Sequence, residues 1–323
     1  MKKRDTLRYI MAFLLVLSTT SCQKIIEFNG DETDPHLVLV SLPEAGSPWI
    51  ARMTESRFFL INDTIATVKN ASMAITVNGS PLNTTVTNHG NGMYDMGYTP
   101  QPGDSLTLHA TVPGKGTIKA GGRFPKPVSI GDISCTFDTV HPLIANGTDT
   151  VVAVTGDISI KFRLDDPAEE TNYYMVRIAM PSLDDTYDPS GYYVISDTIV
   201  AYRSFSIDDN ILFDIDAANE LFGFEEEDYY GEEVFFTDER INGQSHTINL
   251  LLGTHRPAPL DLFCRVEVYS VSRDYYLYKK SIKSASNRID FNSIISEPIQ
   301  IYSNVTDGIG ILGCATAVKF TVQ

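Results

Sequence analysis

DSLTLHATV, residues 104–112, alternates apolar and polar side chains with the two-residue period of a β-strand that buries one face. Turn-forming pairs such as Asn78-Gly79 and Asn91-Gly92 separate it from similar segments upstream, because asparagine and glycine tolerate positive φ. About seven short strands over roughly 90 residues fit an immunoglobulin-like β-sandwich. The upstream segments are HLVLVSL (36–42), SRFFLIND (56–63), ASMAITVNG (71–79) and TTVTNHGNGMYDM (84–96).

A second β-rich part follows the segment GGRFPKPVSIGD (121–132), whose two prolines remove backbone donors and stiffen the chain. We place a domain boundary near Pro127. The sequence therefore predicts a mainly β protein, with an immunoglobulin-like sandwich over 36–127 and a β-rich, sandwich-like C-terminal domain over 128–323.

One helix interrupts the strand pattern of the second part. Tyr275, Tyr278 and Ile282 recur at three- and four-residue spacing, which places them on one face of a helix over 273–285. Ser272 stands directly before it and is a candidate N-cap. We expect this helix to pack against the sheets of the second domain.

The N-terminus has the order of a bacterial export signal. Basic residues, Lys2-Lys3-Arg4, precede the apolar run YIMAFLLVL (9–17), and small residues then lead to Cys22. An apolar run of about nine residues is too short to span a bilayer and is typical of a signal peptide. The small residues before cysteine resemble a lipobox, so we predict a signal peptide over 1–21 and a tether over 22–35. Cys22 would carry diacylglyceryl and palmitate chains, which give stable anchoring. The alternative is an ordinary secretory signal with an incidental cysteine.

The composition allows a globular fold and argues against nucleic-acid binding. Hydrophobic residues make up 43% of the chain and charged residues 20%, so a sizeable core is available. The net charge of −16 repels phosphate, whereas nucleic-acid binding requires basic patches.

Three cysteines follow Cys22, an odd number without a CxxC motif, which argues against zinc ribbons and thioredoxin-like sites. Cys264 and Cys314 each alternate with apolar residues on strand-like segments. Two interpretations stay open: both are small buried hydrophobes, or they form a disulfide with each other.

The remaining motifs predict neither a cofactor nor a catalytic site. Gly308-Ile309-Gly310-Ile311-Leu312-Gly313 matches GxGxxG, but a strand-like segment follows it where a dinucleotide site needs a helix. The glycines more simply allow a bulge or a close backbone approach. The acidic run over 225–233 lacks the pattern of a calcium loop, so a solvated loop is expected, with calcium binding as the alternative. The histidines show no metal-binding spacing.

Paired tyrosines beside glycine- and acid-rich loops are our candidates for a docking surface. Tyrosine buries a large area while keeping a polar tip, which suits it to interfaces. The four residues are Tyr192, Tyr193, Tyr229 and Tyr230.

The chain resembles a lipoprotein family of Bacteroidota that is known only as domain of unknown function 4249, most clearly in its C-terminal third. The resemblance rests on Glu297-Pro298, then Ser303-Asn304, then Gly308-Ile309-Gly310 before the last strand. It implies a sandwich followed by a β-rich domain, covers nearly the whole mature chain, and brings no catalytic residues. It also implies a genomic neighbourhood with TonB-dependent outer-membrane receptors.

Exported proteins of that phylum are O-glycosylated at a motif similar to Asp-Ser/Thr followed by an aliphatic residue or threonine. The candidates here lie at or near predicted strand starts, where a side chain can still reach solvent. An aspartate before β-branched residues is also how strands begin, so turn chemistry is the alternative. The candidates are Thr64, Ser105, Thr150 and Thr198.

We therefore expect a non-enzymatic lipoprotein of the outer membrane, an accessory or binding component of a TonB-dependent transport system. Whether it faces the periplasm or the cell surface stays open. An envelope hydrolase acting on glycan or peptide, or a structural surface adhesin, are the alternatives.

The lipid anchor gives the first testable prediction. Cys22→Ala should release the mature protein from membranes, because we expect no other segment to hold it there. Cell fractionation with a high-salt wash measures this, and a variant that still pellets with membranes would contradict the lipoprotein hypothesis.

Overall fold

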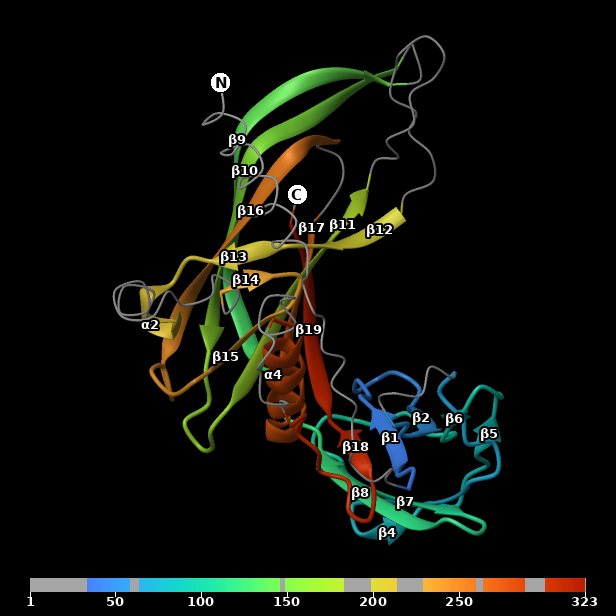
Figure 1. Ribbon diagram of the computed structural model, residues 1–323. Coiled ribbons are helices and arrows are strands. Elements are labelled where there is room, and N and C mark those ends of the chain that lie inside the picture. The colour runs from blue at the N-terminus through green and yellow to red at the C-terminus, as the bar shows by residue number, and fades with distance from the viewer. Residues whose placement is uncertain are drawn as a thin grey trace, which may run out of the picture. The chain divides into compact units, whose positions relative to one another are not determined.

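The computed structural model describes residues 34–58, 64–145, 149–182, 199–213, 229–259, 264–287 and 300–322. Within these ranges the chain is mainly β, with antiparallel sheets and little helix, which confirms the predicted fold class (Figure 1). No helix in the described ranges is long and apolar enough to cross a membrane.

Two sheets pack face to face in the first sandwich. Its strands are β1 Leu37–Ser41, β2 Ile50–Glu55, β3 Ser72–Val77, β4 Ser80–Pro81, β5 Thr87–Asn88, β6 Met93–Asp95, β7 Ser105–Val112, β8 Gly116–Arg123 and β18 Ile309–Leu312. One sheet runs β18-β1-β2-β6-β5 and the other β4-β3-β7-β8. Leu39 and Met53 from one sheet meet Leu108 from the other in a shared apolar core, and Trp49 is fully buried there.

The alternation of apolar and polar residues does not indicate strand β2. The expected strand over 56–63 is not seen in its described part, residues 56–58, and IARMTE (50–55) forms the strand instead. Ala51 and Met53 are its buried positions, but the small alanine gives a weak apolar signal. Arg52 and Glu55 further blur the alternation.

Strand β18 comes from the far end of the chain and pairs in parallel with β1, with Leu39 opposite Gly310. The segment 128–323 therefore contributes a strand to the first sandwich. Gly310 has φ +121°, and a Cβ there would overlap the Leu39 carbonyl. A Cβ on Gly308 would lie 2.8 Å from the Leu37 carbonyl oxygen. The expectation that these glycines allow a close backbone approach is confirmed.

Side-chain hydrogen bonds of Asn304 hold β18 in place. Its Oδ1 accepts a hydrogen bond from the Leu312 amide at 2.9 Å, and its Nδ2 lies 3.0 Å from Leu312 O and 3.1 Å from Asp274 Oδ2. The Ser-Asn motif therefore joins β18 to the first turn of the helix over 273–287.

The second sandwich holds the longer strands. They are β9 Ser129–Ala145, β10 Asp149–Asp165, β11 Tyr173–Ser182, β12 Ile199–Arg203, β13 Phe205–Ile207, β14 Tyr230–Gly231, β15 Val234–Thr237, β16 Ser245–Pro259, β17 Cys264–Val271 and β19 Ala315–Val322. One sheet runs β14-β13-β16-β10-β9, and the other runs β12-β11-β17-β19 with β15 also on β11. Phe162, Val176 and Val266 lie in the core between them.

Three strands continue past the rest of their sheet. The pairing of β13 with β16 covers only Ser206–Leu251 and Ile207–Leu250. Strands β16, β10 and β9 run on, and Val154 pairs with Ala258 on one side and Val140 on the other (Figure 1). We call residues 139–145, 149–155 and 254–259 the ribbon.

Helix α4 (Arg273–Asn287) confirms the predicted helix and its cap, because the Tyr275 amide donates to Ser272 Oγ at 3.3 Å. Tyr275 is buried against Met175 and Phe235 on the outer face of the second sheet. The expectation of one packed helix is confirmed, and a short second helix, α2 (Asn210–Phe213), is also present.

Cys264 and Cys314 are both free and buried. Cys264 belongs to the second core and Cys314 to the first, so a disulfide between them is excluded. Both side chains are buried among apolar residues, as the first interpretation expects.

The parallel pair β1–β18 gives a stability prediction. Gly310→Ala should lower the free energy of unfolding by on the order of 4 kcal/mol, because the methyl group overlaps the Leu39 carbonyl. Gly46→Ala is the matched control: Gly46 has φ +84° and open space around it, so only the backbone term of about 1–2 kcal/mol applies. Urea titration of both variants measures the difference, and equal losses would contradict the close approach.

Candidate functional site

One end of the second sandwich exposes apolar side chains beside a short helix. Strand β13 leads into α2, and β14 pairs with β13 through Ser206–Tyr230. We call Ile211, Leu212, Phe213, Tyr229 and Tyr230 the α2–β14 surface. Ile211 is 51% exposed and Tyr230 is 49% exposed, so both apolar side chains reach solvent.

Asp209 builds the start of α2. Its Oδ1 accepts hydrogen bonds from the amides of Ile211 at 2.9 Å and Leu212 at 3.1 Å, as an N-cap residue does. Its Oδ2 pairs with Nε2 of His246 on β16. Both side chains are largely buried, so this pair holds α2 against the sheet.

The rings of Phe213 and Tyr229 lie 6.4 Å apart, and Phe213 also contacts Phe236 at 6.4 Å. The Ile207 amide donates to Tyr229 O at 2.8 Å, which fixes the backbone where β14 begins. Tyr229 is thereby half-buried, whereas Tyr230 faces outward.

The other sequence-predicted positions divide between described and undescribed parts. Thr64 and Ser105 are exposed, and Thr150 lies near the start of β10. Glu232 is exposed, and Glu233 is half-buried and pairs with Lys279 at 2.7 Å. Outside the described residues lie Cys22, Tyr192, Tyr193, Thr198 and the acidic run 225–228.

A second polar site, which the sequence did not indicate, joins two loops of this sandwich. Asp166 follows β10 and accepts hydrogen bonds from the Tyr174 hydroxyl and, at 2.8 Å, from the Gly243 amide. Asp238 follows β15 and accepts the Asn172 amide at 2.8 Å. Both carboxylates are buried. The only sequence signal was the Asp165-Asp166-Pro167 turn after a strand.

Burial, and to a smaller extent neighbouring charge, raises two pKa values at this site. Burial raises the pKa of Asp166 above its usual range, and the nearby charge of Asp238 adds to the effect. Hydrogen bonds from Tyr174 and Gly243 oppose it without cancelling it. Burial and the Asp166 carboxylate also raise the pKa of the Tyr174 hydroxyl.

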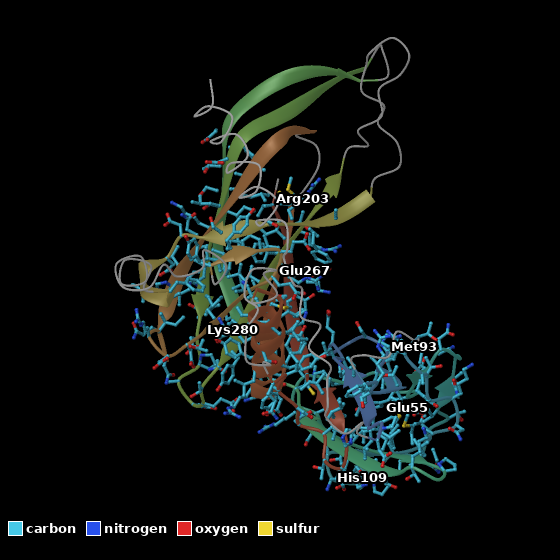
Figure 2. All side chains as sticks on the ribbon, in the orientation of Figure 1. Glu55, Met93, His109, Arg203, Glu267 and Lys280 are labelled. Carbon is cyan, nitrogen blue, oxygen red and sulfur yellow. The ribbon has the colours of Figure 1, made fainter. Side chains whose placement is uncertain are left out.

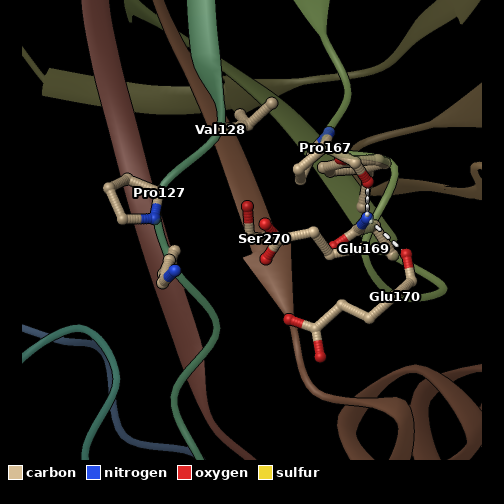
Figure 3. A pocket seen from close by; sticks show the side chains of 9 residues that line it. Pro127, Val128, Pro167, Glu169, Glu170 and Ser270 are labelled. Carbon is tan, nitrogen blue, oxygen red and sulfur yellow. Dashed lines mark hydrogen bonds between the residues drawn. The ribbon is translucent and has the colours of Figure 1, made fainter. Parts of the chain in front are cut away.

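A pocket of about 50 Å³ adjoins this loop, room for a few water molecules and far below a typical small-molecule site (Figure 3). The dashed bonds in Figure 3 tie the Asn172 side-chain amide to backbone oxygens of Pro167 and Glu170. The lining residues are Lys126, Pro127, Val128, Pro167, Glu169, Glu170, Asn172, Tyr174 and Ser270. In the described part of the chain, no three acidic, histidine or cysteine side chains are grouped to hold a metal ion.

The third polar cluster surrounds Glu267 on β17, which is labelled in Figure 2. Its side chain is 1% exposed. Its carboxylate accepts hydrogen bonds from Tyr269 at 2.7 Å, Tyr202 at 3.2 Å and Arg265 Nε at 2.9 Å. The Arg177 guanidinium lies 3.5 Å from the centre of the Tyr202 ring. Arg177 Nε is buried without a hydrogen-bond partner and lies 3.9 Å from Glu233 Oε1.

Opposing effects set the pKa of Glu267. Burial raises it, but the hydrogen bond from Tyr269 and the charges of Lys319, Arg265 and Arg177 together lower it below the ordinary value. The folded state therefore binds this proton less tightly than the unfolded state does. The resulting stabilisation is present above the ordinary glutamate pKa and is lost as the pH falls through the lowered one.

Glu267→Gln tests this directly. The variant should lose about 1–3 kcal/mol of unfolding free energy at pH 7, because Arg265 loses its charged acceptor. The difference in unfolding free energy between the variant and the unaltered protein should become smaller as the pH falls from 5 towards 3. Glu239→Gln, at an exposed position, is the control and should change little. A gap that is independent of pH would contradict the electrostatic origin.

Comparison with known proteins gives one result for the whole chain. No curated protein and no solved structure matches it significantly. One family model matches residues 23–321, which is nearly the entire length. The chain therefore belongs to the family described as a domain of unknown function, DUF4249.

Proposed function

We propose that this protein is a non-enzymatic binding component of the cell envelope, anchored to the outer membrane by lipid on Cys22. Its partner in this proposal is a TonB-dependent outer-membrane receptor, which it serves as an accessory. Family membership supports the proposal, because the resemblance implied that genomic context. The export signal over 1–21 supports the anchoring part.

The α2–β14 surface carries the binding part of the proposal. Single exposed apolar residues are common, but here Ile211 and Tyr230 flank a packed aromatic pair at one end of a sandwich. Tyrosine and aliphatic side chains on a rigid support lose little entropy on binding. The N-cap at Asp209 and the His246 contact supply that rigidity.

The ribbon supports binding independently. In a chain with 41 acidic residues, the ribbon holds two charged residues, Asp149 and Arg256. Register places Val140, Val154 and Ala258 side by side across its three strands. A sheet segment with few charges that runs past the sandwich suits contact with an apolar partner surface.

Co-purification tests the proposal. The tagged lipoprotein, solubilised from outer membranes of its native host, should bring down one TonB-dependent receptor in near-equal amount. The double change Ile211→Ser and Tyr230→Ser should reduce that recovery at least tenfold. Ile65→Ser is the matched control, because Ile65 is 53% exposed on the first sandwich.

Recovery that is unaffected by the double change would contradict the assigned surface, and absence of any receptor would contradict the accessory role. The hydrolase alternative draws on Asp166, whose raised pKa suits a general acid. Release of sugars or peptides from envelope material that depends on Asp166 would replace our proposal with that alternative.

A further inference from the structure

Two of the cysteines face the same core from opposite sheets. Cys135 lies on β9 and packs, half-buried, against the second core. Cys264 begins β17 in the facing sheet and is 3% exposed within that core. Both are free thiols in the structure.

The strand arrangement brings these residues to one corner of the sandwich. Strand β9 is the edge of its sheet and contacts β19, the edge of the other. Strand β19 pairs with β17, and Val322 stands opposite Cys264. Cys135 packs against the second core, to which Val322 and Cys264 both belong, so both thiols face the space between the two sheets.

The charge of Cys135 also acts on the Cys264 thiol. Burial raises the pKa of Cys264 to about 12, and the Cys135 charge contributes to the rise. A Coulomb interaction weakens with distance, so this contribution agrees with a place of both thiols at the same corner. Burial alone raises the pKa of Cys135.

We propose that Cys135 and Cys264 form a disulfide bond between the two sheets once the chain has been exported. The proposal rests on the export part of the proposed function, since structural disulfides persist in oxidising compartments and are rare in the cytoplasm. It replaces the excluded pairing of Cys264 with Cys314.

The chemistry needs an oxidant, a disulfide-bearing thiol oxidoreductase of the envelope. The Cys135 thiolate attacks the oxidant's disulfide, forming a mixed disulfide and releasing one oxidant thiol. The Cys264 thiolate then attacks the Cys135 sulfur and expels the second oxidant thiol. Two protein thiols are oxidised to one disulfide, and the oxidant is reduced to a dithiol. Because burial disfavours the Cys264 thiolate, the bond forms while the core is still open.

The bond would fasten an edge strand that continues into the ribbon. Pairing with β10 is the strand pairing that holds β9, and its register shifts twice, between Thr155 and Ile158 and between Lys161 and Arg163. A covalent link from Cys135 to β17 would hold β9 on the facing sheet as well.

Sequential thiol labelling tests the proposal without any substitution. Membranes of the native host are denatured with N-ethylmaleimide, then reduced, and newly released thiols are labelled with iodoacetamide. Peptide mass spectrometry should show the second label on Cys135 and Cys264, and the first label on Cys314, the matched buried control. N-ethylmaleimide on Cys135 and Cys264 would overturn the proposal.

Variants and fractionation separate the remaining outcomes. Reductant should lower the melting temperature of the unaltered protein and leave that of Cys135→Ser unchanged, and equal responses would overturn the proposal. Free thiols in protein recovered from the envelope would refute the disulfide and leave the proposed function standing. Protein that stays in the cytoplasm would refute the export on which both rest.

Discussion

The contact between Gly310 and the Leu39 carbonyl is the constraint on which the fold depends. It lets β18 lie in parallel beside β1, although most of the chain separates the two in sequence. Strand β19 begins only three residues after β18 ends and belongs to the second sandwich. One short stretch, 309–322, therefore supplies a strand to each sandwich. Side chains of Asn304 and Ser272 hold this stretch against α4.

Buried carboxylates in this acidic protein hold neighbouring segments together through hydrogen bonds. Asp104 accepts hydrogen bonds from Tyr98 and Asn78, and Asp166 joins two loops. Glu267 accepts hydrogen bonds from two tyrosines and an arginine. Each is largely buried yet well supplied with donors, as burial of a charge requires. Their structural role explains their perturbed pKa values without any catalytic function.

Local signals in the sequence were sufficient for the local structure. The Asn78-Gly79 turn has the expected positive φ at both residues, and α4 begins after its predicted cap. The period of apolar residues does not show which strands pair when they lie far apart in the sequence. The residues IGIL (309–312) do not indicate that β1 is their pairing partner. Asp209 and His246 come together only because β13 and β16 pair in one sheet.

In the candidate site, too, local features could be predicted from the sequence and contacts between distant segments could not. Tyr229 and Tyr230 were selected from the sequence because aromatic residues stood beside a loop, and that reason applies at any distance from the core. Ile211 and Phe213 gave no such signal, since a four-residue helix has no periodicity to detect. Pairing with β13 places Tyr230 on β14, and the hydrogen bond from the Ile207 amide holds Tyr229 just before that strand; neither contact can be predicted from the local sequence.

The position of β18 also sets an order of events at the ribosome. Residues 37–123, which contain the other eight strands of the first sandwich, are made long before residue 309. Until then the β1 edge stays open, and the core lacks Leu312 and Cys314. The first part of the protein to be synthesised is thus among the last to be completed. Exposed strand edges pair readily with other chains, so the β1 edge needs protection until residues 309–312 reach it.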